Sequence, residues 1–155
     1  MGEPENPEVK KGAVLDREDL TLDSLMAACA PGYPKGPYAI ANGAGLSAGD
    51  WSEALFRAAR IRGLSISVRT GLEAREGGLF FGARTRAIEV TCSRNPARLR
   101  AYLLLGKKDG DVLVRLFRIA EEPTGCAGRC SIGDAELEAY VRHACAQAHL
   151  LAAGV

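Results

Sequence analysis

The middle of the chain reads as a series of short strands joined by tight turns, and this pattern constrains the fold more than any other feature. Apolar and polar residues alternate over residues 64–69, which is typical of a strand with one buried face. Two longer strands are expected over residues 97–105 and 111–119, and the Asp109-Gly110 pair between them favours a hairpin because both residues tolerate a positive φ. Consecutive strands joined by such short turns pair antiparallel.

Three amphipathic helices are expected around this sheet. The first follows Asp16, and the second covers Asp50–Ile61, with capping-box spacing from Ser47 and a stop at Gly63. The third begins near Asp134 and carries apolar residues at 3.6-residue intervals. One face of the sheet needs a cover, and the first and last helices carry the apolar residues to provide it.

We therefore predict a single α+β domain over residues 13–155. Its antiparallel sheet would carry the N- and C-terminal helices on one face and the Asp50–Ile61 helix on the other. Residues 1–12 are acidic and rich in proline, and we expect them to form a disordered tail. The N-terminus lacks the basic-then-apolar order of a signal peptide, and no apolar run approaches the roughly 20 residues that span a bilayer. The odd number of cysteines, five, favours reduced thiols in the cytosol or nucleus.

The charges are distributed unevenly along the sequence, although the net charge is only +1. Residues 57–118 contain fourteen basic and five acidic residues, a net charge of +9, whereas residues 1–24 carry −4 and residues 119–155 carry −3. A basic region of this kind is a candidate surface for an acidic partner. An equally good interpretation is that arginines on exposed strands keep the sheet soluble and its edges unpaired.

Residues 78–88 have the sequence Gly-Leu-Phe-Phe-Gly-Ala-Arg-Thr-Arg-Ala-Ile, and residues 111–117 form a second strand-like motif. These segments are similar to two strand motifs of the profilins, a family of small proteins that bind actin monomers. Residues 121–126 resemble a loop of plant profilins, and residues 148–155 resemble the end of the family's last helix. The chain departs from the family in its first helix, which lacks aromatic residues, because the only tryptophan, Trp51, lies on another element.

The resemblance implies a regulator of the actin cytoskeleton in the cytoplasm, a monomer that binds monomeric actin and is neither an enzyme nor dependent on a cofactor. The actin contacts that it implies lie on the strand with Arg84, Thr85, Arg86 and Ile88, on the neighbouring strand and at the start of the last helix. Further candidates are the other arginines expected on the sheet face, Arg98, Arg100 and Arg115. Independently of the family, guanidinium groups on a sheet suit an acidic, partly apolar partner because they make charge-assisted hydrogen bonds. Profilins also bind proline-rich proteins and phosphoinositides. Only His149 matches the proline-binding residues, so we expect polyproline binding to be weak or absent, and anionic phospholipids are a further candidate partner.

Two alternatives use other residues. The basic region could serve a nucleic-acid or protein interaction module, with Tyr102 stacking on bases, but the chain has no RNA-binding motif and we rank nucleic acid below a protein partner. Cys126, Cys130, His143 and His149 fit a loose zinc-site spacing. The two histidines are six residues apart and diverge by about 120° on a helix, so we expect no metal. No catalytic motif that we can defend is present.

Overall fold

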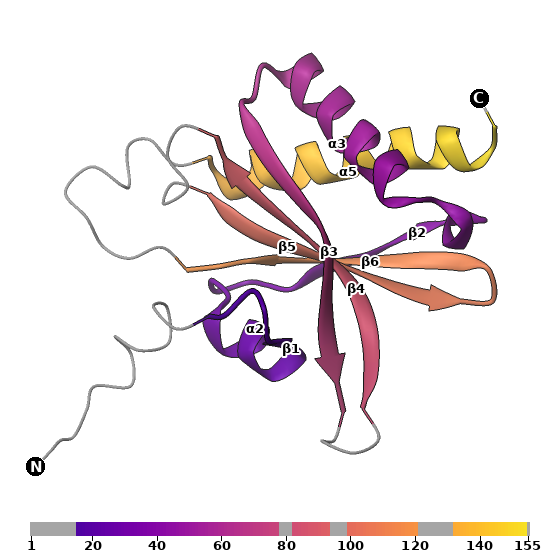
Figure 1. Ribbon diagram of the computed structural model, residues 1–155. Helices are drawn as coiled ribbons and strands as arrows, with labels where there is room; N and C mark the ends of the chain where they lie inside the picture. The colour runs from indigo at the N-terminus through magenta and orange to yellow at the C-terminus, as the bar shows by residue number, and fades with distance from the viewer. Residues whose placement is uncertain (1–14, 78–81, 94–98, 121–131, 155) are drawn as a thin grey trace, which may run out of the picture.

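A six-stranded sheet with helices on both of its faces forms the centre of the computed structural model (Figure 1). The structure describes residues 15–77, 82–93, 99–120 and 132–154. Within these ranges the chain forms β1 (Leu20–Thr21), α2 (Leu22–Ala28), β2 (Lys35–Ile40), a 3₁₀ turn (Gly43–Gly45), α3 (Ala48–Arg62), β3 (Ile66–Glu76), β4 (Ala83–Cys92), β5 (Arg100–Lys108), β6 (Asp111–Arg118) and α5 (Asp134–Ala152). The tail predicted at residues 1–12 lies outside the described residues.

The predicted antiparallel run and the α+β class are confirmed. The strand order is β1-β3-β4-β5-β6-β2, and each pair from β3 to β6 is antiparallel. The β5–β6 hairpin turns at Asp109 and Gly110, whose φ angles of 55° and 89° are the positive values that the sequence favours. Two edge strands complete the sheet, since β2 pairs antiparallel with β6 and the two-residue β1 pairs parallel with β3.

Helix α3 begins and ends at the signals read from the sequence. Its N-cap, Ser47, accepts a hydrogen bond from the Asp50 N–H, and the Asp50 carboxylate accepts one from the Ser47 N–H. Gly63 follows the helix with φ of 69°, a conformation that glycine adopts without strain. The last helix begins at Asp134 as expected, and its N-cap is Gly133, which has no side chain to accept a capping hydrogen bond. None of the helices in the described part of the chain combines the length and apolarity needed to cross a bilayer.

The predicted placement of the helices is wrong. Helices α3 and α5 lie together on one face of the sheet, and α2, the first helix, lies on the opposite face (Figure 1). The first core contains Trp51 of α3, Tyr140 of α5 and Leu103 of β5. The second core contains Leu25 of α2 and Leu104 of β5. Leu104 directly follows Leu103 on the strand and therefore points to the opposite face of the sheet.

The reason for this error is that the central strands are buried on both faces. All five residues from Ala101 to Leu105 are buried, so each face of β5 needs its own cover. The seven-residue helix α2 covers only part of one face, together with Leu15 and Leu20. The longer α3 and α5 pack side by side over the other, where small residues such as Ala58 and Ala144 allow close approach.

Candidate functional site

The sheet divides between β4 and β5. These strands pair from Thr91 opposite Arg100 to Arg86 opposite Leu105, and the pairing ends there. Beyond this point, and within the part of the chain that the structure describes, residues 83–85 pair only with β3 and residues 106–108 pair only with β6. The β3–β4 hairpin consequently points away from the β5–β6 hairpin, as Figure 1 shows. We call the region between residues 83–85 of β4 and residues 106–108 of β5 the fork.

A bulge in β3 accounts for the bend of the first hairpin. The β3–β4 register shifts between Arg69 and Leu72, and Gly71 within this interval has φ of 81°. A bulge adds a residue to one strand, bends it and increases its local twist. The second half of β3 and the strand paired with it therefore leave the direction of β5, which keeps its pairing with β6.

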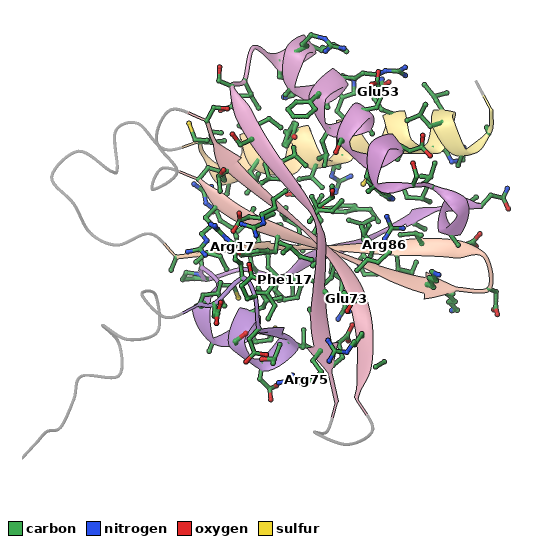
Figure 2. All side chains as sticks on the ribbon, viewed as in Figure 1. Arg17, Glu53, Glu73, Arg75, Arg86 and Phe117 are labelled. Atoms are coloured by element: carbon green, nitrogen blue, oxygen red, sulfur yellow. The ribbon has the colours of Figure 1, made fainter. Side chains whose placement is uncertain are left out.

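The fork contains a groove of about 520 Å³. Its lining combines acidic, basic and small residues and comprises Glu73, Glu76, Ala83, Arg84, Thr85, Arg86, Leu105, Gly106 and Lys107. Glu73 of β3 and Arg86 of β4 both lie close to the point at which the hairpins part (Figure 2). Because side chains alternate along a strand, the lining draws on both faces of the sheet.

Both carboxylates of the groove already have basic partners. Glu73 lies 3.5 Å from the Arg84 guanidinium, and Glu76 accepts hydrogen bonds from Arg115 of β6, at 2.8 Å, and from the Thr85 hydroxyl. The Arg86 guanidinium instead donates to the Leu46 carbonyl at 3.1 Å, so its charge is not neutralised there. The exposed Lys107 makes no ion pair within the described residues. The groove therefore retains a net positive charge.

The structure separates the candidate actin contacts that the sequence grouped in one site. Arg84, Thr85 and Arg86 do meet in the groove. Ile88 is only 2% exposed and belongs to the core beneath α3 and α5, so it is unavailable to a partner. Arg100 lies against the buried Glu89, and its Nε donates to the Tyr102 hydroxyl at 3.2 Å.

Of the two remaining predicted residues, Arg115 is not among the residues that line the groove. Arg115 is held against Glu76 by the ion pair described above, and Arg98 lies outside the described residues. Conversely, Lys107, Glu73 and Glu76 line the groove although no sequence pattern indicated them. Lys107 lies two residues before the hairpin turn, where β5 is no longer paired with β4 but is still paired with β6. Only the register between β4 and β5 shows this separation, and the sequence does not contain it.

His149 lies in a second groove, between the edge strand β2 and α5. This groove measures about 540 Å³, and its lining comprises Tyr38, Ala39, Ile40, Arg142, Cys145, Ala146, His149 and Leu150. Tyr38 supplies an aromatic ring, with the Arg142 guanidinium 5.4 Å from its centroid. Its hydroxyl donates to Glu138 at 3.1 Å, a hydrogen bond that lowers the pKa of that carboxyl. Weak or absent polyproline binding stays a prediction.

The cysteine of this second groove has no reactive character. Burial raises the pKa of the Cys145 thiol to about 12, so it stays protonated at neutral pH. The described residues contain no group of three or more potential metal ligands. The expectation that these four residues bind no zinc stays a prediction, because Cys126 and Cys130 lie outside the described residues while His143 and His149 lie on α5.

Tyr102 does not lie on an exposed sheet face. Its side chain is fully buried, and its hydroxyl donates to the Glu89 carboxylate at 2.6 Å. It therefore cannot stack on a nucleic-acid base in the folded protein, and this part of the nucleic-acid interpretation is wrong. Tyr102 belongs to the second core, which also contains Leu104 and Phe117.

All four tyrosines should resist ionisation, and we expect the protein to lose stability at alkaline pH. Burial, and then in each case a hydrogen bond to a carboxylate, raises the pKa of Tyr33, Tyr38 and Tyr102 to about 12. Burial also raises the pKa of Tyr140. Between about pH 10 and pH 12 the unfolded chain releases phenolic protons that the folded chain keeps, so the free energy of unfolding falls as the pH rises.

Ultraviolet absorbance of phenolate measures this effect. At pH 10.5 the folded protein should show much less phenolate absorbance than the same protein in urea, and the urea midpoint should be lower at pH 11 than at pH 9. A native titration curve centred near pH 10 for all four tyrosines would contradict the prediction. The Tyr38→Phe variant serves as the control, because Tyr38 is only half-buried and its loss should remove one phenol with little other change.

Comparisons of the chain with protein-family models, with curated proteins and with solved structures gave no match. The residues and geometry of the fork are therefore the basis of the functional assignment.

Proposed function

We propose that the protein is an interaction module that binds an acidic region of a partner protein in the fork groove. The observation that carries this proposal is the meeting of Arg84, Arg86 and Lys107 in one groove of about 520 Å³. Two of these cations have no carboxylate partner within the described residues, so a carboxylate from outside would gain charge-assisted hydrogen bonds without breaking an existing ion pair. The same charges would also speed the encounter with an acidic partner.

The lining of the groove favours a protein over a nucleic acid. Glu73 and Glu76 stand among the basic residues, and they would repel closely spaced phosphates. Single-stranded nucleic acids also bind by stacking on exposed aromatic rings, and the groove has none within the described residues. Glu73 lies directly opposite Arg86, but a polypeptide can place single carboxylates at Arg86 and Lys107 without the dense charge of a phosphate backbone.

Monomeric actin is the partner that the resemblance to profilins suggests, and actin binding, with a cytoskeletal location, is part of this proposal. Support comes from Arg84, Thr85 and Arg86, which belong to the profilin-like motif and lie in the groove. The arrangement of the helices gives no support, because the first and last helices lie on opposite faces. Binding of phosphoinositides and other anionic lipids likewise stays a prediction.

Charge reversal in the groove tests the proposal. We expect the protein to bind immobilised poly-glutamate at low salt, and Arg84→Glu to elute at roughly half the salt concentration that elutes the natural protein. Arg84 is suited to this test because its side chain is 64% exposed, so the substitution leaves the core intact. If labelled actin monomers bind, the same variant should weaken that binding by about tenfold, which corresponds to about 1.4 kcal/mol.

The matched control is Arg60→Glu, the same change at an exposed position of α3 outside the groove. Equal losses in the two variants would show that only net charge matters and would contradict a site in the fork. Tighter retention by single-stranded RNA than by poly-glutamate would favour the nucleic-acid alternative. An absence of any effect on actin assembly would exclude actin as the partner and leave the acidic-partner proposal to the column measurement.

A further inference from the structure

The fork leaves two short strand edges without a second partner strand among the described residues. Residues 83–85 of β4 keep β3 as a neighbour, residues 106–108 of β5 keep β6, and no other described strand pairs with either edge. Half of the backbone N–H and C=O groups of such an edge point away from the paired neighbour. At the fork these groups face the groove that holds the basic residues.

Gly106 gives one of these edges room for another chain. A Cβ placed at Gly106 would have the Leu113 carbonyl, at 3.7 Å, as its nearest neighbour, which is an ordinary contact, so no steric demand of the fold requires glycine here. Its φ is not in the left-handed region either. Glycine inside a strand weakens the strand, and it often marks a place where another backbone comes close.

The side chains around this edge differ between its two faces. Lys107 points to the same face as Arg86, because Arg86 pairs with Leu105 and residues two apart along a strand share a face. Gly106 points to the other face, beside the half-buried Leu113 opposite it on β6. One face of the β5 edge therefore suits a carboxylate. The other face carries the Glu76–Arg115 ion pair, in which the two charges are already matched, and beside it Gly106 and Leu113 leave a place for an apolar side chain.

We infer that the fork receives an extended segment of a partner protein in which acidic and apolar residues alternate, and that this segment pairs as a short strand with Gly106–Lys108 of β5. It would occupy the position that β4 vacates beyond Arg86 and would run antiparallel to β5, as β4 does. Its acidic residues would meet Lys107 and Arg86, and its apolar residues would cover Gly106. This inference rests on the proposed function and adds the backbone conformation and sequence pattern of the partner.

A synthetic peptide tests the inference. The probe is a fluorescein-labelled, eight-residue peptide of alternating valine and glutamate, titrated by fluorescence anisotropy at 50 mM and 150 mM salt. We expect saturable binding that Lys107→Glu weakens at least tenfold, while Arg60→Glu changes it by less than about twofold. An isomer with four valines followed by four glutamates has the same charge and should bind at least tenfold more weakly.

Backbone methylation of the peptide separates strand pairing from charge. Methyl groups on the nitrogens of either the valines or the glutamates remove the N–H groups on one edge of the peptide and leave those on the other. We expect one of these two peptides to lose at least tenfold in affinity and the other to bind within about threefold of the parent. That result, together with the loss in Lys107→Glu, supports the inference.

The contrary outcomes separate this inference from the proposed function. If both methylated peptides and the block isomer bind as the parent does while Lys107→Glu still weakens binding, strand pairing is refuted and the acidic-partner proposal stands. If the parent peptide binds and Lys107→Glu has no effect, the fork is not the site and both fail. If the parent peptide does not bind although poly-glutamate does, the inference is overturned and the proposed function survives.

Discussion

Replacing Trp51 with alanine is expected to lower the free energy of unfolding by about 4 kcal/mol, because a fully buried indole leaves a large cavity. Trp51 has no exposed surface and stands in the core between α3, α5 and the sheet. The same core contains Tyr140 of α5, whose hydroxyl donates to the Leu55 carbonyl of α3 at 3.2 Å. That hydrogen bond and the sheet beneath hold the two helices in place, so they cannot collapse fully into the space that the indole leaves.

Urea unfolding followed by circular dichroism measures this loss, since the variant has no tryptophan left to report by fluorescence. The control is Trp51→Phe. The indole N–H is buried without a hydrogen-bond partner within the described residues, so phenylalanine removes an unsatisfied donor while it keeps most of the apolar contact. We expect this variant to lose less than about 2 kcal/mol. A loss below about 1 kcal/mol in the alanine variant would show that α3 does not pack against the sheet as described.

Local signals in the sequence were sufficient for most of the elements. The alternation over residues 64–69, the capping residues Ser47 and Asp50, and the positive-φ turn at Asp109 each act within a few residues, and each is found where expected. Prolines at positions 31, 34 and 37 are typical of a loop, but β2 begins at Lys35 and contains Pro37. Proline is compatible with β2 because β2 is an edge strand.

The placement of α2 and the fork depend on contacts between distant residues, and the sequence does not contain these as a local pattern. The run of apolar residues at Ala101–Leu105 fits a strand buried on both faces, but it does not say which helix covers which face. Likewise, Arg84 and Arg115 read as members of one exposed set. Arg84 lines the groove because the pairing between β4 and β5 stops at Arg86, and Arg115 is occupied because it forms an ion pair with Glu76.

Glu89→Ala is the second substitution with a large expected effect, a loss of about 3 kcal/mol in the free energy of unfolding. Glu89 is 4% exposed and lies on β4 beneath the segment that precedes β1. Its carboxylate accepts from the Tyr102 hydroxyl at 2.6 Å and from Arg17 at 3.1 Å, and Arg100 lies 3.6 Å away. Alanine would leave a buried hydroxyl without this acceptor and two guanidinium groups without their counter-charge.

Most of this loss should come from Tyr102 and Arg100, because the Arg17 side chain is 39% exposed and water can replace its partner. Glu89→Gln tests this division, since the amide oxygen still accepts from Tyr102 but carries no charge, and we expect it to lose about half as much stability as the alanine variant. In a double-mutant cycle, Arg17→Ala and Glu89→Ala should couple by less than about 1 kcal/mol. A larger coupling energy would mean that Arg17 holds the N-terminal segment against the sheet more strongly than an exposed ion pair can. Losses below about 1 kcal/mol in both Glu89 variants would refute the buried cluster as a source of stability.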